Sequence, residues 1–236
     1  MYWFDPTMLL VIPPMLLALY ASYKVRSAFA EYSRHPARSG LTGAEVAEAI
    51  LRRNGLGDVP VEPTEGQLTD HYDPRKRVLR LSEPVYRSSS LAALGVAAHE
   101  AGHALQDARG YVPLKLRQGI WPVAAFGSNL GPILAMIGIL LMLGTHAGWA
   151  KLIAEVGIIV FAAATFFTVL TLPVEFNASR RALAVLEDGG FITASERPYA
   201  KKVLDAAALT YLSAALVSAM MLLRFILLFA GASRRD

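Results

Sequence analysis

Two histidines and a glutamate form the part of the sequence whose residue types and spacing could do chemistry. His99 and His103 are four residues apart, and Glu100 lies between them. Residues four apart share one face of a helix, so both imidazoles can reach one metal ion. Glu100 projects about 100° further round the helix, where its carboxylate can act as a base toward metal-activated water. The pattern predicts zinc-dependent hydrolysis with Glu100 as the catalytic base.

The residues around this motif predict a thin helix that packs tightly. Alanines dominate residues 92–104, and Gly102 allows another backbone to come close. Residues 88–90 are three serines that can cap the start of a helix, which should run to about Asp107. The apolar run at residues 91–105 is too short to span a bilayer and contains both histidines. We therefore expect a buried helix of a polar domain.

Composition indicates a membrane protein. Hydrophobic residues make up 54% of the 236 residues, and the mean hydropathy is +0.40. The chain has no cysteine, so disulfides are excluded and any metal ligands must be histidine and carboxylate. The net charge of +4 is modest, and no patch is typical of nucleic-acid binding. The lipid bilayer is therefore an expected partner, and nucleic acid is not.

The predicted fold is mainly α, with four transmembrane helices and a small α+β metalloprotease domain. In chain order, we expect a first transmembrane helix at 1–23, the protease domain at 24–118, a hairpin of the second and third transmembrane helices at 119–172, a polar segment at 173–205, the fourth transmembrane helix at 206–230 and a tail at 231–236. A signal peptide is the alternative for the first segment. Asp5 is the only charged residue before Lys24, which favours a retained anchor.

The basic residues predict how the chain is oriented. Of the 23 lysines and arginines, 14 lie in residues 24–118 and 5 in residues 173–205. Cytoplasmic loops are enriched in such residues, so both segments should face the cytoplasm and both termini the opposite side. We expect a multi-pass protein of the plasma membrane with its active site on the cytoplasmic face.

Local patterns predict further elements of the polar segments. Thr42 and Glu45 form a capping-box pattern that opens a helix ending near Asn54. Residues 66–71 and 77–82 are predicted to be the two strands of a hairpin. Pro173 is predicted to open a new helix after the third span.

Glu175 is the expected third metal ligand. Two spans return it to the same side of the membrane as the motif helix, and two histidines plus a glutamate are a common zinc ligand set. The alternative is an acid that complements the dipole at the start of a helix.

Three stretches of sequence together resemble a known family. They are His-Glu-Ala-Gly-His-Ala-Leu-Gln, Leu-Thr-Asp-His-Tyr-Asp-Pro-Arg before it, and Pro-Val-Glu-Phe-Asn-Ala-Ser-Arg-Arg after the third span. They resemble the YugP-type neutral zinc metallopeptidases of bacterial membranes over about residues 65–181. A more distant similarity is to the HtpX and CAAX-prenyl membrane proteases. The resemblance implies a gluzincin-like site, with one zinc ion per chain on His99, His103 and Glu175 and with Glu100 as base.

The chain departs from the gluzincin pattern around these ligands. Gluzincins usually carry an acid four residues after the ligand glutamate, where this chain has Ser179. We expect Ser179, Asn177 and Gln106 to support the ligands instead.

The expected function is a membrane-embedded zinc endopeptidase that acts on a peptide or protein, most simply a membrane-associated one. His71 and Tyr211 are candidates for the oxyanion donor. The peptide is expected to add to an open edge of strand 77–82, through Val78, Leu79 and Arg80.

Three other functions compete with this one. A non-catalytic scaffold would use zinc to tie two loops together and would need a fourth protein ligand. A divalent-metal transporter would need more histidines or acids within its spans, and Glu155 and His146 lie near one end. An intramembrane protease of the site-2 kind would need an aspartate ligand within a span.

Overall fold

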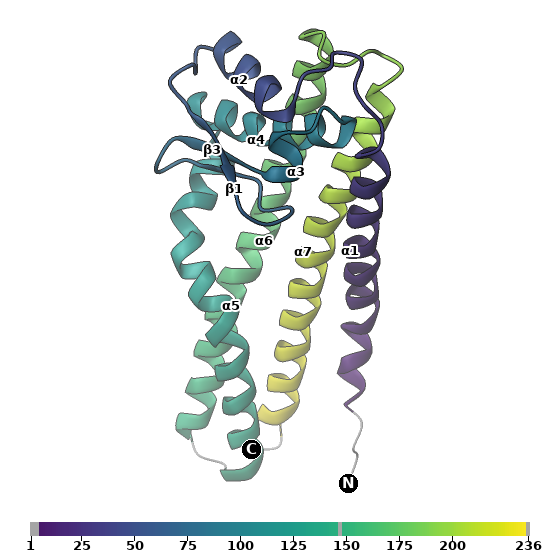
Figure 1. The fold of residues 1–236 in the computed structure, drawn as a ribbon. Coiled ribbons are helices and arrows are strands. Elements are labelled where there is room, and N and C mark those ends of the chain that lie inside the picture. The colour runs from purple at the N-terminus through teal and green to yellow at the C-terminus, as the bar shows by residue number, and fades with distance from the viewer. Residues whose placement is uncertain (1–4, 146–147, 235–236) are drawn as a thin grey trace. The chain divides into compact units, whose positions relative to one another are not determined.

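The protein is mainly helical in this computed structural model, which describes residues 5–145 and 148–234 (Figure 1). The chain divides into two compact units. The polar unit comprises Ala21–Lys115 and Pro173–Thr210, and the helical unit comprises Met1–Tyr20, Leu116–Leu172 and Tyr211–Asp236. His146, considered above as a transporter residue, lies outside the described residues.

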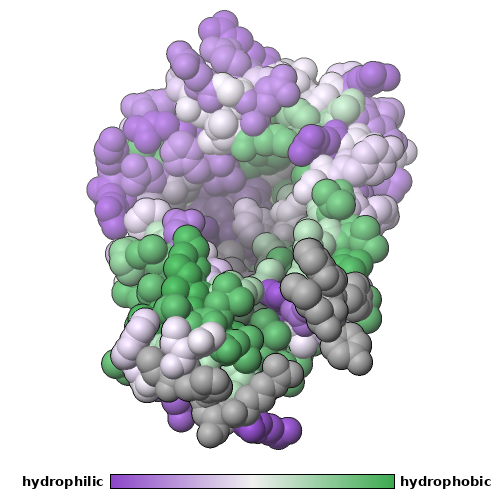
Figure 2. Space-filling view, turned by 90° about the horizontal axis from the view of Figure 1, so that it is seen from below, coloured by the Kyte–Doolittle hydropathy of each residue, from purple (hydrophilic) through white to green (hydrophobic). Residues whose placement is uncertain are grey.

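Four helical segments are long and apolar enough to cross a membrane. They are Pro6–Tyr32, made of the 3-10 helix η1 (Pro6–Leu10) and α1 (Ile12–Tyr32), then α5 (Val112–Thr145), α6 (Gly148–Asp188) and α7 (Arg197–Ser233). Each exceeds the roughly 20 residues that span a bilayer. Large hydrophobic side chains are exposed on all four, for example Leu19, Phe126, Ile159 and Ile226, and such residues cover broad areas of the surface in Figure 2. The expectation of four long apolar helices is confirmed.

Within the helical unit, α5 and α6 run side by side and pack through small residues (Figure 1). A Cβ atom on Gly138 of α5 would overlap the backbone of Ala154, and one on Gly157 of α6 would overlap the backbone of Ala135. Small residues of this kind let membrane helices approach closely.

An ion pair ties the first and last segments of the helical unit. Nη2 and Nε of Arg224 lie 2.8 and 3.2 Å from one carboxylate oxygen of Asp5. The other oxygen of Asp5 accepts hydrogen bonds from the backbone N–H and the hydroxyl of Thr7 at 2.9 and 2.6 Å. Both charged groups are therefore satisfied inside this unit.

The helices of the polar unit begin where their caps predict. α2 (Gly43–Arg53) starts after Thr42, whose reciprocal capping box with Glu45 is present. α4 (Leu91–Ala108) starts after Ser90, whose hydroxyl accepts a bond from the N–H of Ala93. Both helices contribute to one hydrophobic core, together with the short helix α3 (Glu83–Tyr86), the sheet and residues 182–204.

The predicted hairpin is present, but its first strand is displaced. β2 (His71–Asp73) pairs antiparallel with β3 (Val78–Ser82), whereas the prediction placed the first strand at residues 66–71. Gly66 and Leu68 have φ angles of +98° and +57°. Positive φ is incompatible with an extended strand, so this stretch curls back and the strand begins only at His71.

The prediction that a peptide adds to an edge of β3 is wrong. A third strand, β1 (Val61–Thr64), pairs parallel with β3, so the sheet order is β1-β3-β2 and β3 is paired on both sides. Val78 and Leu79 are buried in the core. Arg80 forms ion pairs with Glu62 and Asp73. Leu79 and Arg80 are thus paired on both sides, and the backbone N–H of Ser82 is bonded to Asp70, so the expected open edge is absent at these residues.

The prediction that Pro173 opens a new helix is also wrong. α6 continues without interruption from Gly148 to Asp188, with Pro173 inside it. A proline removes one helical hydrogen bond, and long membrane helices tolerate this loss. Glu175 therefore lies in the interior of a helix, which removes the alternative that it complements a helix N-terminus.

Candidate metal centre

The motif histidines lie on one buried face of α4. His99, Glu100 and His103 are each no more than 9% exposed. The imidazole ring centroids are 4.8 Å apart and the rings are nearly perpendicular, at 89°. The helical spacing has thus placed both rings over the same point, as the sequence predicts.

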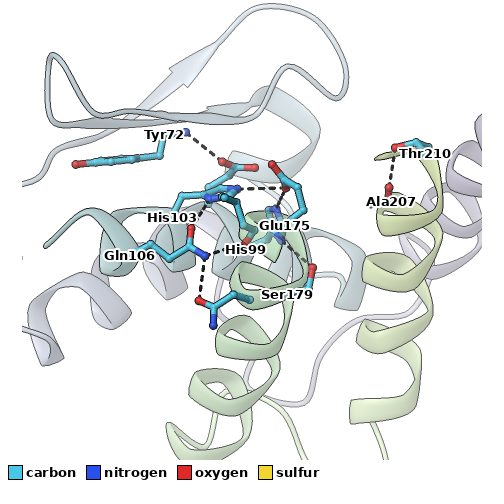
Figure 3. Close-up of polar contacts among 11 residues, drawn as sticks. Tyr72, His99, His103, Gln106, Glu175, Ser179, Ala207 and Thr210 are labelled. Atoms are coloured by element: carbon cyan, nitrogen blue, oxygen red, sulfur yellow. Dashed lines mark hydrogen bonds and ion pairs between the residues drawn. The ribbon is translucent and has the colours of Figure 1, made fainter. Parts of the chain in front are cut away.

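Glu175 of α6 completes the cluster (Figure 3). Its Oε2 lies 3.1 Å from Nε2 of His99 and 3.4 Å from Nε2 of His103. Ligand atoms about 2.1 Å from a tetrahedral zinc ion are about 3.4 Å apart, so these separations suit a shared ion. One ligand atom from each residue lies within 4.8 Å of the others. These residues fit a zinc ion that keeps its fourth position for water or substrate.

Mutual attraction holds this cluster in a charged state. Burial alone would raise the pKa of Glu175, but hydrogen bonds and charge from His103 and His99 hold that pKa far below its usual 4.5. Burial alone would lower the pKa of His103, but the hydrogen bond to Glu175 and the negative charges of Glu100 and Glu175 raise it above 6.5. A buried carboxylate that remains ionised is suited to a cation.

Neutral groups support both imidazoles on the side away from Glu175. Nδ1 of His99 lies 3.1 Å from the hydroxyl of Ser179, and Nδ1 of His103 lies 3.0 Å from Oε1 of Gln106. Nε2 of Gln106 donates to Oδ1 of Asn177 at 3.0 Å. The structure therefore brings Ser179, Gln106 and Asn177 around the candidate ligands.

Gly102 allows α4 and α6 to approach closely. A Cβ atom at this position would lie 2.9 Å from the carbonyl oxygen of Ala178 and 3.4 Å from its Cα. A methyl group therefore cannot fit unless one helix moves. Because Glu175 lies on the same helix as Ala178, this contact sets how far the glutamate is from the histidines.

Glu100 is hydrogen-bonded to the sheet. Its Oε2 accepts a hydrogen bond from the backbone N–H of Tyr72, at 3.1 Å (Figure 3). Tyr72 belongs to β2, an edge strand. Its phenol donates to Asp107 of α4 at 3.0 Å, and burial together with Asp107 raises the pKa of this phenol to about 12. The tyrosine therefore anchors the edge strand beside the carboxylate that is the predicted base.

Asp70 is a second acid near Glu100. Burial and the charge of Glu100 raise its pKa above 3.8. It accepts bonds from the backbone N–H and hydroxyl of Ser82, at 2.8 and 3.0 Å. It thereby fastens the start of the hairpin to the end of β3. No role was predicted for Asp70 or Tyr72, although both lie in the stretch that carries the family resemblance.

Of the two candidate oxyanion donors, His71 has a hydrogen-bond partner outside the cluster. His71 is exposed, and its Nδ1 bonds the carbonyl of Thr69 at 2.8 Å. Tyr211 is the first residue of α7 assigned to the helical unit. Its role as a donor remains a prediction.

The fold and the site define a class of protein with four long apolar helices and a buried cluster of two histidines and one glutamate that could hold a metal ion. The chain belongs to the family described as "Putative neutral zinc metallopeptidase", whose profile matches residues 7–230. It is also 53% identical over 220 residues to the "Putative membrane protease YugP" of Bacillus subtilis (strain 168), which covers 93% of this chain and 95% of that protein. No solved structure gives a significant match. The resemblance inferred from the three sequence stretches is confirmed.

Proposed function

We propose that this chain is a membrane-embedded endopeptidase that binds one zinc ion through His99, His103 and Glu175. The observation that carries the proposal is the convergence of three buried ligand atoms beside a carboxylate, Glu100, that is not among them. Membership of a zinc metallopeptidase family supports it. The local arrangement is gluzincin-like, because the glutamate ligand comes from a helix separate from the motif helix.

The residues around the cluster have separate roles in peptide hydrolysis. Zinc bound there supplies Lewis acidity and lowers the pKa of water. Glu100 accepts the proton of the attacking water and later donates it to the leaving amine. The backbone N–H of Tyr72 holds the Glu100 carboxylate in position. Ser179 and Gln106 hold the two imidazoles, so the ligands need little reorganisation during turnover.

The outer edge of β2 is the proposed docking site for an extended peptide. β2 is an edge strand of the sheet, and the N–H of Tyr72 points away from β3 toward Glu100. Because the N–H of Tyr72 is bonded to Glu100, a peptide would pair with the carbonyl oxygen of Tyr72, which points to the same side of the strand, and would pass next to Glu100. Such pairing depends little on side chains, which suits an endopeptidase acting on membrane-associated proteins.

A zinc-binding scaffold is the main alternative, and the geometry argues against it. A structural zinc site uses four protein ligands. Within residues 5–145 and 148–234, the cluster that could hold a metal consists of three residues. Glu100, which follows His99 in the sequence, instead accepts a bond from the backbone N–H of Tyr72.

Hydrolysis of fluorescein-labelled casein by the purified chain in detergent tests the proposal. The wild type with zinc should cleave the casein, and chelation should abolish cleavage. Glu100→Gln should lower the rate by about 10²–10⁴-fold, the usual contribution of a general base, yet retain one zinc per chain. Equal rates for the wild type and Glu100→Gln would exclude Glu100 as the base. Comparing the membrane proteomes of cells that carry the two forms would then identify the natural substrates.

We further propose that the metal centre faces the cytoplasm, because the two polar segments carry 14 and 5 of the 23 basic residues. The chain has no cysteine, so single cysteines report orientation without background labelling. Cysteines introduced at the exposed residues Ser39 and Ser195 should resist an impermeant thiol reagent in intact cells. A cysteine at Thr145, which is exposed at the end of α5, should react. The opposite pattern would reverse the orientation.

A further inference from the structure

Gln106 makes three hydrogen bonds inside the polar unit, and each has a different kind of partner. It lies one turn after His103 on α4 and is wholly buried. Its Nε2 donates to the carbonyl oxygen of Val174 at 2.8 Å and to Oδ1 of Asn177 at 3.0 Å. Its Oε1 lies 3.0 Å from Nδ1 of His103. One side chain therefore joins the motif helix to the stretch of α6 that carries Glu175.

The chemistry of the partners fixes which way the Gln106 amide points. A backbone carbonyl can only accept, so the Gln106 atom facing Val174 must be the NH₂ group. The contact with Asn177 independently requires the same orientation of the Gln106 amide. Its Oδ1 also lies 2.7 Å from Nε of Arg181, and a guanidinium can only donate. The oxygen of Asn177 is thus held toward Gln106 and needs a donor there.

This orientation determines the state of His103. With its NH₂ group committed to α6, Gln106 presents only an oxygen to Nδ1 of His103. An amide oxygen accepts but cannot donate, so Nδ1 must carry the proton. The neutral imidazole then has its lone pair on Nε2, the nitrogen that faces Glu175. His99 has no such constraint, because the hydroxyl of Ser179 can either donate or accept.

We propose that Gln106 is a positioning residue that holds His103 in the Nδ1–H tautomer, the form whose Nε2 can bind a metal, and that Arg181 supports it through Asn177. This inference rests on the proposed metal site. It assigns the chain its own solution to a task that gluzincins give to an acid. Arg181 donates to Asn177 within α6. Gln106 of α4 donates to Asn177 and to the carbonyl oxygen of Val174, which both belong to α6.

The expected effect of Gln106→Glu on zinc affinity is unusual. A carboxylate near a histidine ligand normally strengthens metal binding. Here the second carboxylate oxygen would face two acceptors, the Val174 carbonyl and Oδ1 of Asn177, at the positions where Nε2 now donates. The carboxylate would be repelled from α6 and His103 would lose its fixed acceptor. We therefore expect Gln106→Glu to bind zinc less tightly than the wild type.

Zinc affinity, measured on the full chain in detergent by competition with a chromophoric chelator, tests this. Gln106→Glu and Gln106→Met should each bind zinc about 10–100-fold more weakly than the wild type, the usual effect of losing such a partner. Arg181→Met should lose a few-fold, and Arg181→Lys, which keeps a donor, should recover part of the loss. Arg180→Met is the matched control, because Arg180 is exposed on the same helix with the same charge. It should bind zinc like the wild type.

Long-range ¹H–¹⁵N spectra of the metal-free chain, labelled in histidine and recorded with His103 neutral, provide a readout that a general loss of packing would not give. The His103 signals should show the Nδ1–H tautomer in the wild type, and a mixture of the two tautomers in Gln106→Met. Gln106→Glu that binds zinc as tightly as the wild type, or an unprotonated Nδ1 on His103, would overturn the positioning role alone. If Gln106→Glu does not fold, Arg181→Met and the wild-type spectrum still decide the matter. A wild type that binds no zinc would instead overturn the proposed metal site.

Discussion

Two clusters of charged groups, one partly buried and one buried, differ in kind. In the helical unit, Arg224 and Asp5 form a closed pair in which one cation meets one anion, and Thr7 occupies the remaining carboxylate oxygen. In the polar unit, Glu175 faces two imidazoles, and Glu100 lies nearby with a separate partner. The first arrangement is complete without anything added. The second gathers several ligand atoms around one point.

This difference separates a structural pair from a candidate site. A pair that neutralises itself needs no further group, and its value lies in holding two segments together. A cluster with more acceptors than donors is stabilised by an added cation. Burial of ionisable groups is common to both, so burial alone does not identify a site. The balance of donors and acceptors does.

Removing the Glu175 carboxylate should have the largest effect on zinc affinity. Glu175→Ala leaves two buried imidazoles without their shared partner, so zinc affinity should fall by more than the roughly 100-fold that loss of an outer partner costs. Zinc content of the purified variant, measured by mass spectrometry, checks this. Full zinc occupancy in Glu175→Ala would exclude Glu175 as a ligand.

Acidification should affect the metal centre next most strongly. The pKa of His103 is raised above 6.5, so a proton competes with zinc and apparent affinity should fall about tenfold per pH unit below that raised pKa. In the metal-free chain, the protonation of His103 has the opposite effect, because it stabilises the fold. His103 stabilises the fold fully below pH 6.5 and loses this contribution as pH rises through its folded pKa. Glu175 stabilises above pH 4.5 and loses its contribution as pH falls through its lower folded pKa.

Thermal unfolding with and without zinc measures both trends at once. The metal-free chain should be most stable between about pH 5 and 6.5, since both contributions are present there. The increase in melting temperature on adding zinc should grow from pH 6 to pH 8. An increase that is the same at both pH values would contradict the competition between zinc and the proton at His103.

Breaking the closed pair should reduce stability and leave the metal centre unchanged. Arg224→Met leaves Asp5 without its cation, and loss of a hydrogen bond to a charged group costs about 1–3 kcal/mol of unfolding free energy. Adding Asp5→Asn should restore part of that loss, because no uncompensated charge remains. Zinc affinity should match the wild type in both forms. A tenfold change in zinc affinity would mean that the two arrangements are coupled.

The smallest expected effect comes from the contact that sets the spacing of the site. Gly102→Ala places a methyl group 2.9 Å from the carbonyl oxygen of Ala178. Overpacking of this kind costs about 1–3 kcal/mol, and the better helix propensity of alanine offsets roughly 0.5–1 kcal/mol. Gly95→Ala on the same helix is the control, because its Cβ would lie at an ordinary 3.7 Å from the nearest atom. Gly102→Ala should lower both melting temperature and zinc affinity, and Gly95→Ala should lower neither.

Local signals in the sequence predicted local structure well. The caps at Thr42 and Ser90 gave the starts of α2 and α4, because a cap and its acceptors lie within one turn. β1 was missed, since a four-residue strand that contains Pro63 has no alternation and pairs with a strand 18 positions further along the chain. The prediction from Pro173 was wrong because a long membrane helix can continue through a proline. Proline therefore does not always mark the start of a helix.

In the site, too, the features set within one helix were predicted, and those set by distant contacts were not. The spacing of His99 and His103 predicts their common face, since it is a property of one helix. The contact between Tyr72 and Glu100 could not be predicted, because it uses a backbone N–H, which every residue but proline carries. The orientation of Gln106 depends on partners 68 and 71 positions away along the chain. No spacing within the sequence records it.

Gly102 also bears on how much information the motif holds. In its general form, His-Glu-x-x-His leaves two positions free, so it occurs in many unrelated chains by chance. The contact with Ala178 removes one of these freedoms, since only a hydrogen atom fits at the second position without moving a helix. In this fold the diagnostic pattern is therefore His-Glu-x-Gly-His. A search that requires the glycine would discard most accidental matches, because only about 7% of residues in proteins are glycine.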